Sequence, residues 1–210
     1  MSKNGKYFFH LYALLLATGL RIGEALGLTI DDIDFTNNQI NINHQLHYRR
    51  IDGKTQFYCD YGTKTKAGMR IIPMTEYVRA ILIEQIKIVN ELEFDKTFEL
   101  NGFKNFIFIS NTSKTGKPLY PSNVRRNMKS ISSKNENRDI KLPIISPHIL
   151  RHTACTRMVE LGLNIKAIQS VMGHRDIKMT LNLYTHIDNT TVRNELNKLH
   201  TYANFTPFFL

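Results

Sequence analysis

The sequence predicts an α+β domain that is mostly helical and contains one small antiparallel β-sheet. Apolar residues recur at helical spacing in the opening segment and in most of the chain after residue 75, whereas short alternating segments lie between residues 39 and 72. The 210 residues show no internal repeat and no linker with a change of composition. We therefore expect a single domain over residues 1–210.

The opening segment is predicted to be a core helix that ends at Gly19. The apolar run over residues 7–20 also resembles a secretory signal, but it contains His10, lacks a small-residue cleavage site and is too short to span a bilayer. One face of the expected helix carries Phe8, Leu11, Leu14, Leu15 and Thr18.

A second, shorter helix is expected over Arg21–Leu26, and Thr29 is placed to cap a further turn. From residue 35 onward the pattern changes to that of strands. The strand candidates are Gln39–Asn43, Gln56–Cys59 and Arg70–Ile72. The turn-rich residues 62–68 separate the last two candidates, so a small antiparallel sheet is the expected arrangement.

Helices account for most of the remaining chain. Thr75 is expected to cap a long helix with an apolar inner side, and Phe106–Ile109 is either a strand or a buried connector. Pro121 opens a basic helix that should give way to a polar loop over residues 130–138. Further helices are expected at Pro147–Leu161, Ile165–Met172, Lys178–Tyr184 and Thr190–Leu199.

The chain carries a strong positive charge. Its 28 Lys and Arg residues outnumber 18 Asp and Glu residues, and the net charge of +10 favours a polyanionic partner, because each neutralised phosphate releases counterions. The segment between Asn111 and Lys141 is rich in basic residues, although a solvated surface would explain it equally well. Its basic residues are Lys114, Lys117, Arg125, Arg126, Lys129, Lys134, Arg138 and Lys141.

Neither a disulfide nor a metal is expected. Cys59 and Cys155 lack the spacing of metal ligands and should be free thiols of a cytoplasmic protein. His148 and His152 have the spacing of a helical zinc pair, but the zinc-protease pattern needs a glutamate where Ile149 stands. A chain of this length can bury enough surface to fold without either device.

Two motifs pair an arginine with a polar neighbour. Arg21 precedes Glu24 by three residues, so it forms either a surface ion pair or a guanidinium held by a carboxylate and aimed at a phosphate. His148 and Arg151 share a helix face at the same spacing. A helix-start histidine on a partly buried face is the alternative for His148.

Three further candidates are individually weaker. Lys64 lies in the turn-rich segment, where a solvated lysine is the common alternative. His174 follows Gly173, which should close a helix, so an imidazole at the helix end is its alternative. Tyr184 stands ten residues after His174 at the end of an amphipathic helix, where a packed aromatic residue is the alternative.

The ordered set of Arg, Lys, His-x-x-Arg, Gly-His and Tyr resembles the signature of the tyrosine recombinase family of the phage-integrase kind. The segments Ala17–Glu24, Pro147–Thr153 and Met172–His174 are similar to the family's motifs, and Tyr184 follows at the family's short step. The resemblance covers nearly the whole chain. It implies the family's catalytic domain, a recombinase that acts in the integration or excision of a mobile element.

The resemblance also implies how the enzyme would work, without a cofactor. Tyr184 would attack a DNA phosphodiester, giving a 3′-phosphotyrosyl link and a free 5′-hydroxyl. Arg21 and Arg151 would bind the non-bridging oxygens more tightly in the transition state. His148 would relay a proton near the nucleophile, and Lys64 would protonate the leaving 5′-oxygen.

Other residues would support this centre. His174 would donate a hydrogen bond to the phosphate, and Glu24 would orient its neighbours. The residues expected to bind DNA around the centre are Lys66, Arg125, Arg126 and Lys129.

The implied partner is double-stranded DNA. The chain would form a homo-oligomer, a tetramer, on DNA and would be a monomer without DNA. No membrane partner is expected. The family's amino-terminal core-binding and arm-binding domains are expected to be absent, so DNA binding should be weak and sensitive to salt. The C-terminal helix and tail, residues 186–210, would pack either on their own domain or on a neighbouring protomer.

Two other functions would fit a similar fold. A type IB topoisomerase would relax DNA as a monomer, but the short chain and the Gly173-His174 pair favour a recombinase. A non-catalytic DNA-binding protein is opposed by the complete constellation. A helical interaction module would leave that ordered constellation unexplained.

Overall fold

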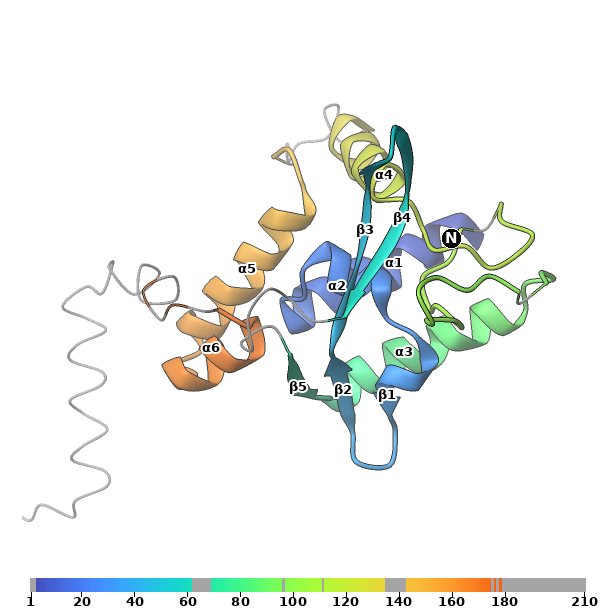
Figure 1. Cartoon of the computed structure of the whole chain (residues 1–210). Helices are drawn as coiled ribbons and strands as arrows, with labels where there is room; N and C mark the ends of the chain where they lie inside the picture. The colour runs from blue at the N-terminus through green and yellow to red at the C-terminus, as the bar shows by residue number, and fades with distance from the viewer. Residues whose placement is uncertain are drawn as a thin grey trace, which may run out of the picture.

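The computed structural model describes residues 3–61, 69–95, 97–110, 112–134 and 143–174, together with residues 176 and 178. Within them it confirms the predicted α+β class (Figure 1). The helices are α1 (Lys3–Thr18), α2 (Ile22–Gly27), α3 (Glu76–Asn90), α4 (Pro121–Lys134), α5 (Pro147–Glu160) and α6 (Ile165–Met172), with a 3₁₀ turn at Ile30–Asp32. The strands are β1 (Ile33–Asp34), β2 (Gln39–Ile42), β3 (His44–Ile51), β4 (Lys54–Tyr61) and β5 (Arg70–Pro73).

Helix α1 lies at the centre of the domain, as predicted. Its core face buries Leu11, Leu14 and Leu15 completely, and the helix packs against both α3 and α5. Gly19 ends it with φ of +66°, a left-handed conformation that costs glycine least. None of the helices in the described part of the chain has the length and apolar character needed to cross a membrane.

Helix α2 is held tightly on β3. A Cβ atom at Gly23 would lie only 2.8 Å from the backbone carbonyl oxygen of Leu46, so the helix can approach the strand this closely only without a side chain there. The His44 imidazole Nε2 and the Gly27 carbonyl oxygen form a hydrogen bond of 2.7 Å at the end of the helix. These contacts fix the helix that begins directly after Arg21.

The strands form two antiparallel units, which corrects the prediction of one sheet. β1, β2 and β5 form a three-stranded sheet in that order, whereas β4 pairs with β3 in a separate hairpin (Figure 1). The sequence-based interpretation overlooked β3. Asp52 and Gly53 at the hairpin tip have φ of +50° and +78°, as a two-residue hairpin turn requires, and this turn returns β4 onto β3.

Local capping marks the start of three helices. Thr75 accepts a hydrogen bond from the backbone of α3, as predicted, and Ser146 and Asn164 do the same at α5 and α6. The loop predicted from residue 130 is wrong at its start, because α4 continues to Lys134. The helices predicted at Lys178–Tyr184 and Thr190–Leu199 lie outside the described residues.

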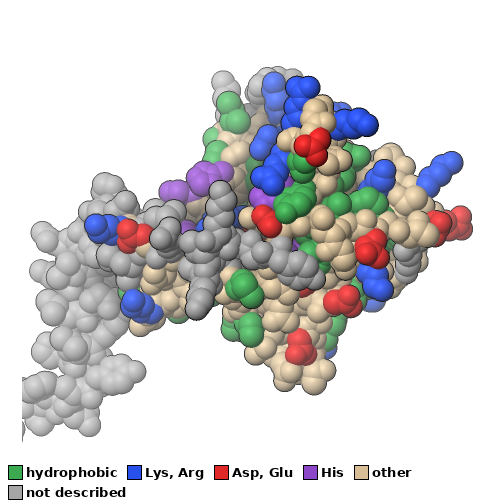
Figure 2. All heavy atoms as spheres, in the orientation of Figure 1, with side chains coloured by type: hydrophobic (Ala, Val, Ile, Leu, Met, Phe, Trp, Pro, Cys, Tyr) green, Lys and Arg blue, Asp and Glu red, His purple; other side chains and the backbone are tan. Residues whose placement is uncertain are grey.

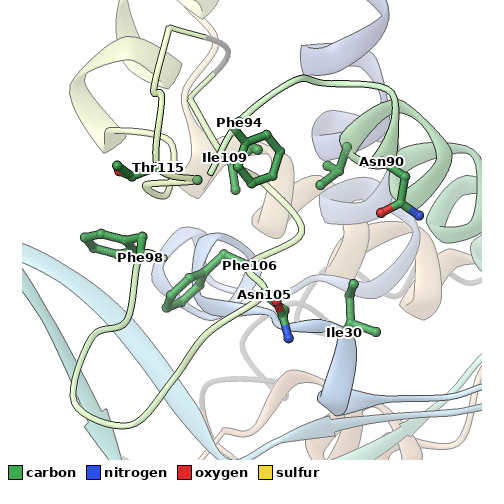
Figure 3. Close-up of a pocket in the computed structure, with 10 residues that line it drawn as sticks. Ile30, Asn90, Phe94, Phe98, Asn105, Phe106, Ile109 and Thr115 are labelled. Carbon is green, nitrogen blue, oxygen red and sulfur yellow. The ribbon is translucent and has the colours of Figure 1, made fainter. Parts of the chain in front are cut away.

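In the connection between α3 and α4, the segment Phe106–Ile109 is a buried connector rather than a strand. Ile107 and Phe108 are fully buried, and the Ile107 backbone donates a hydrogen bond to the Leu28 carbonyl. The same connection borders a small pocket whose lining includes the aromatic rings of Phe94 and Phe98 (Figure 3).

Candidate active site

The Glu24 carboxylate is the buried centre of the candidate site. Glu24 is 1% exposed and accepts two hydrogen bonds of 2.8 Å from Arg21, one from the backbone N–H and one from Nη1. Burial acts to raise the pKa of Glu24, but the bonds and charges of Arg70 and Arg21 outweigh it and hold that pKa below its ordinary value. Arg21 and Glu24 therefore form the predicted ion pair, in which a buried carboxylate holds a partly exposed guanidinium.

Arg70 is a member of this site that the sequence-based interpretation missed. Its Nη1 and Nη2 atoms donate to the two Glu24 oxygens at 3.1 Å and 2.8 Å, and its side chain is only 5% exposed. In the sequence Arg70 was recognised only as the start of a strand. A buried carboxylate needs more compensation than one half-exposed arginine supplies, and this physical requirement is the signal that points to a second cation.

Arg151 lies on the inner side of α5 and is 7% exposed. Its Nη1 donates to the Gly19 carbonyl at 2.5 Å, and its Nη2 donates to the Met172 carbonyl at 2.6 Å. Burial, reinforced by the charge of Arg21, lowers the pKa of Arg151 to about 10. The guanidinium therefore stays protonated near neutral pH, and it bridges the end of α1 to the end of α6.

Three consecutive carbonyl oxygens at the end of α6 each accept a hydrogen bond from a different arginine. These carbonyls have no partner within the helix and carry the negative end of its dipole, so they attract cations. The end of α6 thus gathers arginines from three separate parts of the chain. The pairs are Arg70 with Val171, Arg151 with Met172, and Arg21 with Gly173.

His174 directly follows this helix end and is 8% exposed. Burial, together with the charges of the three neighbouring arginines, lowers its pKa to about 4. The imidazole is therefore neutral near pH 7 and keeps one N–H group that can donate a hydrogen bond.

The low pKa of His174 predicts a pH-dependent stability. In the unfolded chain His174 takes up a proton near its ordinary pKa, whereas in the folded chain it resists protonation until about pH 4. Its contribution to the free energy of unfolding is complete above about pH 6.5 and is lost as pH falls toward 4, by up to about 3 kcal/mol. Urea unfolding at several pH values in this window measures the slope.

The variant H174Q is the control for this slope. It cannot titrate, so its free energy of unfolding should change less with pH than that of the wild type. His47, whose pKa is also lowered by burial, is present in both proteins and cancels in the comparison. Equal slopes for the two proteins would show that His174 is not held neutral.

Gly173 provides a test of the packing at this helix end. Its φ is +60°, and an added Cβ would lie 2.9 Å from Nη1 of Arg70. The change G173A should lower the free energy of unfolding by about 1–2 kcal/mol for the backbone alone, with roughly 1–3 kcal/mol more for displacing Arg70. Gly162 has φ of +71° with open space around it, so G162A carries the backbone cost alone. Equal losses in chemical denaturation would contradict the contact.

Of the remaining catalytic candidates, His148 lies among the described residues, and no hydrogen bond or ion pair there joins its side chain to this cluster. His148 is exposed at the start of α5, one helical turn before Arg151. Lys64, Lys66 and Tyr184 lie outside the described residues.

Three of the four residues predicted to bind DNA are exposed on α4, apart from the cluster, and the fourth, Lys66, lies outside the described residues. The three on α4 are Arg125, Arg126 and Lys129. Within the described part of the chain, no three His, Cys, Asp or Glu side chains are placed to hold a metal ion. The pocket of Figure 3 shares no residue with the arginine cluster.

The cluster is suited to bind an anion. Two guanidinium groups bind one carboxylate, a third from Arg151 lies nearby, and the neighbouring histidine is neutral, so the site carries excess positive charge. The Arg21 side chain is 38% exposed, which leaves part of its guanidinium open to an incoming group. A phosphodiester, whose single negative charge is shared by two non-bridging oxygens, fits these forked donors.

Comparison with known proteins identifies the family. The sequence model of the phage integrase family matches residues 4–191, and the chain belongs to this family. It is 38% identical over 188 residues to the transposase from transposon Tn916 of Enterococcus faecalis, covering 89% of this chain and 44% of the relative. It is 30% identical to the tyrosine recombinase XerD of Staphylococcus aureus, covering 90% of this chain and 53% of that protein.

Solved structures agree with the fold. The Tn1549 transposon integrase in complex with circular intermediate DNA matches with a TM-score of 0.78 and 37% identity, over 91% of this chain and 59% of that one. The XerA recombinase matches with a TM-score of 0.61 at 21% identity, covering 93% of this chain and 57% of the other, and supports the fold alone. The chain spans about half the length of the curated relatives it matches.

Proposed function

We propose that this chain is the catalytic part of a site-specific recombinase that cleaves and rejoins double-stranded DNA through a 3′-phosphotyrosyl link to Tyr184. The observation that carries the proposal is the gathering of Arg21, Arg70 and Arg151 at the end of α6, directly before His174. Phosphoryl transfer needs positioned positive charge more than covalent help from the protein, and this cluster supplies it.

The described residues have distinct roles in this reaction. Arg21 and Arg151 bind the non-bridging oxygens of the scissile phosphate and stabilise the charge that develops on them. His174, held neutral, donates a hydrogen bond to the same group. Glu24 orients Arg21, and His148, exposed one turn before Arg151, is free to meet the proton of the nucleophile when DNA is bound.

The chemical step exchanges one phosphodiester for another. The Tyr184 oxygen forms a bond to phosphorus and loses its proton to the base, while the bond from phosphorus to the 5′-oxygen breaks and Lys64 protonates that oxygen. Attack by a 5′-hydroxyl on the phosphotyrosine reverses both changes. Because the phosphodiester is exchanged for a phosphotyrosine ester and is not hydrolysed, resealing requires no nucleotide cofactor. The scheme also assigns no role to a metal ion.

DNA would lie across the basic face. Lys and Arg side chains gather at the top of Figure 2, where Figure 1 places α4 and the tip of the β3–β4 hairpin. The rings of Tyr48 and Phe57 on the hairpin pack against Tyr120, just before α4, and join the two elements. The exposed basic residues of this face are Arg49, Arg50, Lys54, Arg125, Arg126 and Lys129.

Transposases, integrases and Xer recombinases among the relatives support recombination of a mobile element over topoisomerase activity. We propose assembly as a tetramer on DNA in the cytoplasm, where the DNA substrate lies. Exchange of residues 186–210 between protomers stays a prediction, because these residues lie outside the described part of the chain.

A suicide-substrate assay tests this function. A duplex carrying the crossover sequence of the parent element, nicked so that the cleaved 5′-end diffuses away, should trap a protein–DNA adduct that survives SDS, with or without EDTA. Relaxation of supercoiled plasmid without strand exchange would favour the topoisomerase alternative. DNA binding without any adduct would show a non-catalytic protein.

A further inference from the structure

Arg70 joins three pieces of the candidate site through one side chain. Its terminal nitrogens fork the Glu24 carboxylate, and its Nε donates to the Val171 carbonyl at 2.7 Å. Because Arg70 is the first residue of β5, these bonds tie that strand to α2 on one side and to the end of α6 on the other.

The two arginines that share Glu24 differ in their access to solvent. The Arg21 side chain is 38% exposed, whereas that of Arg70 is 5% exposed. Arg21 can therefore meet a phosphate from outside, while Arg70 faces the protein interior. Each Glu24 oxygen accepts hydrogen bonds from both arginines, so the place where Arg70 holds the carboxylate determines where Arg21 is held.

The path of the chain before His174 also depends on Arg70. The Gly173 Cα lies so close to the Arg70 guanidinium that an added Cβ would be 2.9 Å from Nη1 and 3.1 Å from Cζ. The guanidinium thus forms the surface over which the chain turns from α6 toward His174.

We propose that Arg70 is a positioning residue, which holds Glu24 and the end of α6 so that Arg21 and His174 act on one phosphate. It acts through these neighbours rather than on the substrate. The proposal rests on the proposed recombinase function and adds a residue outside the Arg-Lys-His-Arg-His-Tyr set.

The charge balance gives this role a distinctive signature. Glu24 is faced by Arg21 at the start of its own helix, by Arg70 from β5 and by Arg151 from α5, with His174 beyond them. Without Arg70, burial of Glu24 is opposed mainly by Arg21, so the pKa of Glu24 should rise. Protonated Glu24 would release Arg21, and activity would then fall with decreasing pH in a range where the wild type is unaffected.

The test is single-turnover adduct formation by the full chain on the nicked crossover duplex, at varied DNA concentration and pH. At saturating DNA, R70Q should form adduct about 100-fold more slowly, with less than about a threefold change in the half-saturating DNA concentration. R70K keeps the positive charge but cannot donate to both Glu24 oxygens at once, so it should form adduct about tenfold faster than R70Q.

Arg79 supplies the matched control. It donates hydrogen bonds to Phe35 and Asn38 in the connection between β1 and β2 and none to Glu24 or to the end of α6, so R79Q should cleave at the wild-type rate. Wild-type rates and pH profiles for R70Q and R70K would overturn the proposal, as would a change in DNA affinity alone. If circular dichroism shows R70Q unfolded, R70K decides. Absence of any adduct from the wild type would instead overturn the proposed function, and this role with it.

Discussion

Replacing Tyr184 with phenylalanine is expected to abolish the covalent adduct while leaving DNA binding nearly unchanged. Phenylalanine keeps the ring but lacks the oxygen that would bond to phosphorus, so the rate of adduct formation should fall at least about 10,000-fold. The adduct is measured as an SDS-resistant band on the nicked duplex. Binding is measured by fluorescence anisotropy at low ionic strength, where phosphate contacts are strongest.

Tyr77 provides the control for this substitution. It is 58% exposed at the start of α3 and belongs to no part of the arginine cluster, so Y77F should retain the adduct. If Y184F still forms an adduct, Tyr184 is not the nucleophile. Mass spectrometry of the DNA-linked peptide would then identify the residue that is.

The helices could be predicted because their boundaries depend on neighbouring residues. Thr75 caps α3 through its own side chain, and Pro147 at the first position of α5 follows the capping Ser146. Gly19 and Gly173 end their helices in the left-handed conformation that glycine adopts most readily. Such signals act within a few residues and can be read directly from a sequence.

The strand pairing depended on signals of longer range. The outer half of β3 is exposed and polar at Tyr48, Arg49 and Arg50, so it lacks the apolar alternation of a half-buried strand. One local signal was present, because the dipeptide Asp52-Gly53 favours a two-residue hairpin turn. Read as a hairpin turn, that dipeptide predicts that β4 pairs with β3, as observed, rather than with β5.

The candidate site divides in the same way. The Arg21–Glu24 pair could be predicted because a spacing of three positions at the start of a helix brings the two side chains together. Arg70 reaches Glu24 only after β5 packs beside α2 and α6, and no local pattern contains that information. The three carbonyl groups at the end of α6 are backbone atoms, which no residue type reveals. Lys64 and Tyr184 stay predictions, because they lie outside the described residues.

Replacing Arg151 should damage both stability and chemistry, since one guanidinium serves both. R151A would leave the carbonyls of Gly19 and Met172 without their donor in a buried site, at a cost of about 1–3 kcal/mol for each carbonyl. It would also remove a charge that stabilises the transition state, slowing adduct formation about 1,000-fold. Urea unfolding and single-turnover cleavage measure the two effects.

Two further variants separate these effects. R151K keeps a positive charge but cannot reach both carbonyls with a rigid fork, so it should be less destabilised than R151A yet still cleave far more slowly than the wild type. Arg157, exposed near the end of the same helix, supplies the control R157A, which should match the wild type in both assays. A normal cleavage rate for folded R151A would show that Arg151 takes no part in the chemical step and serves only to join α1 to α6.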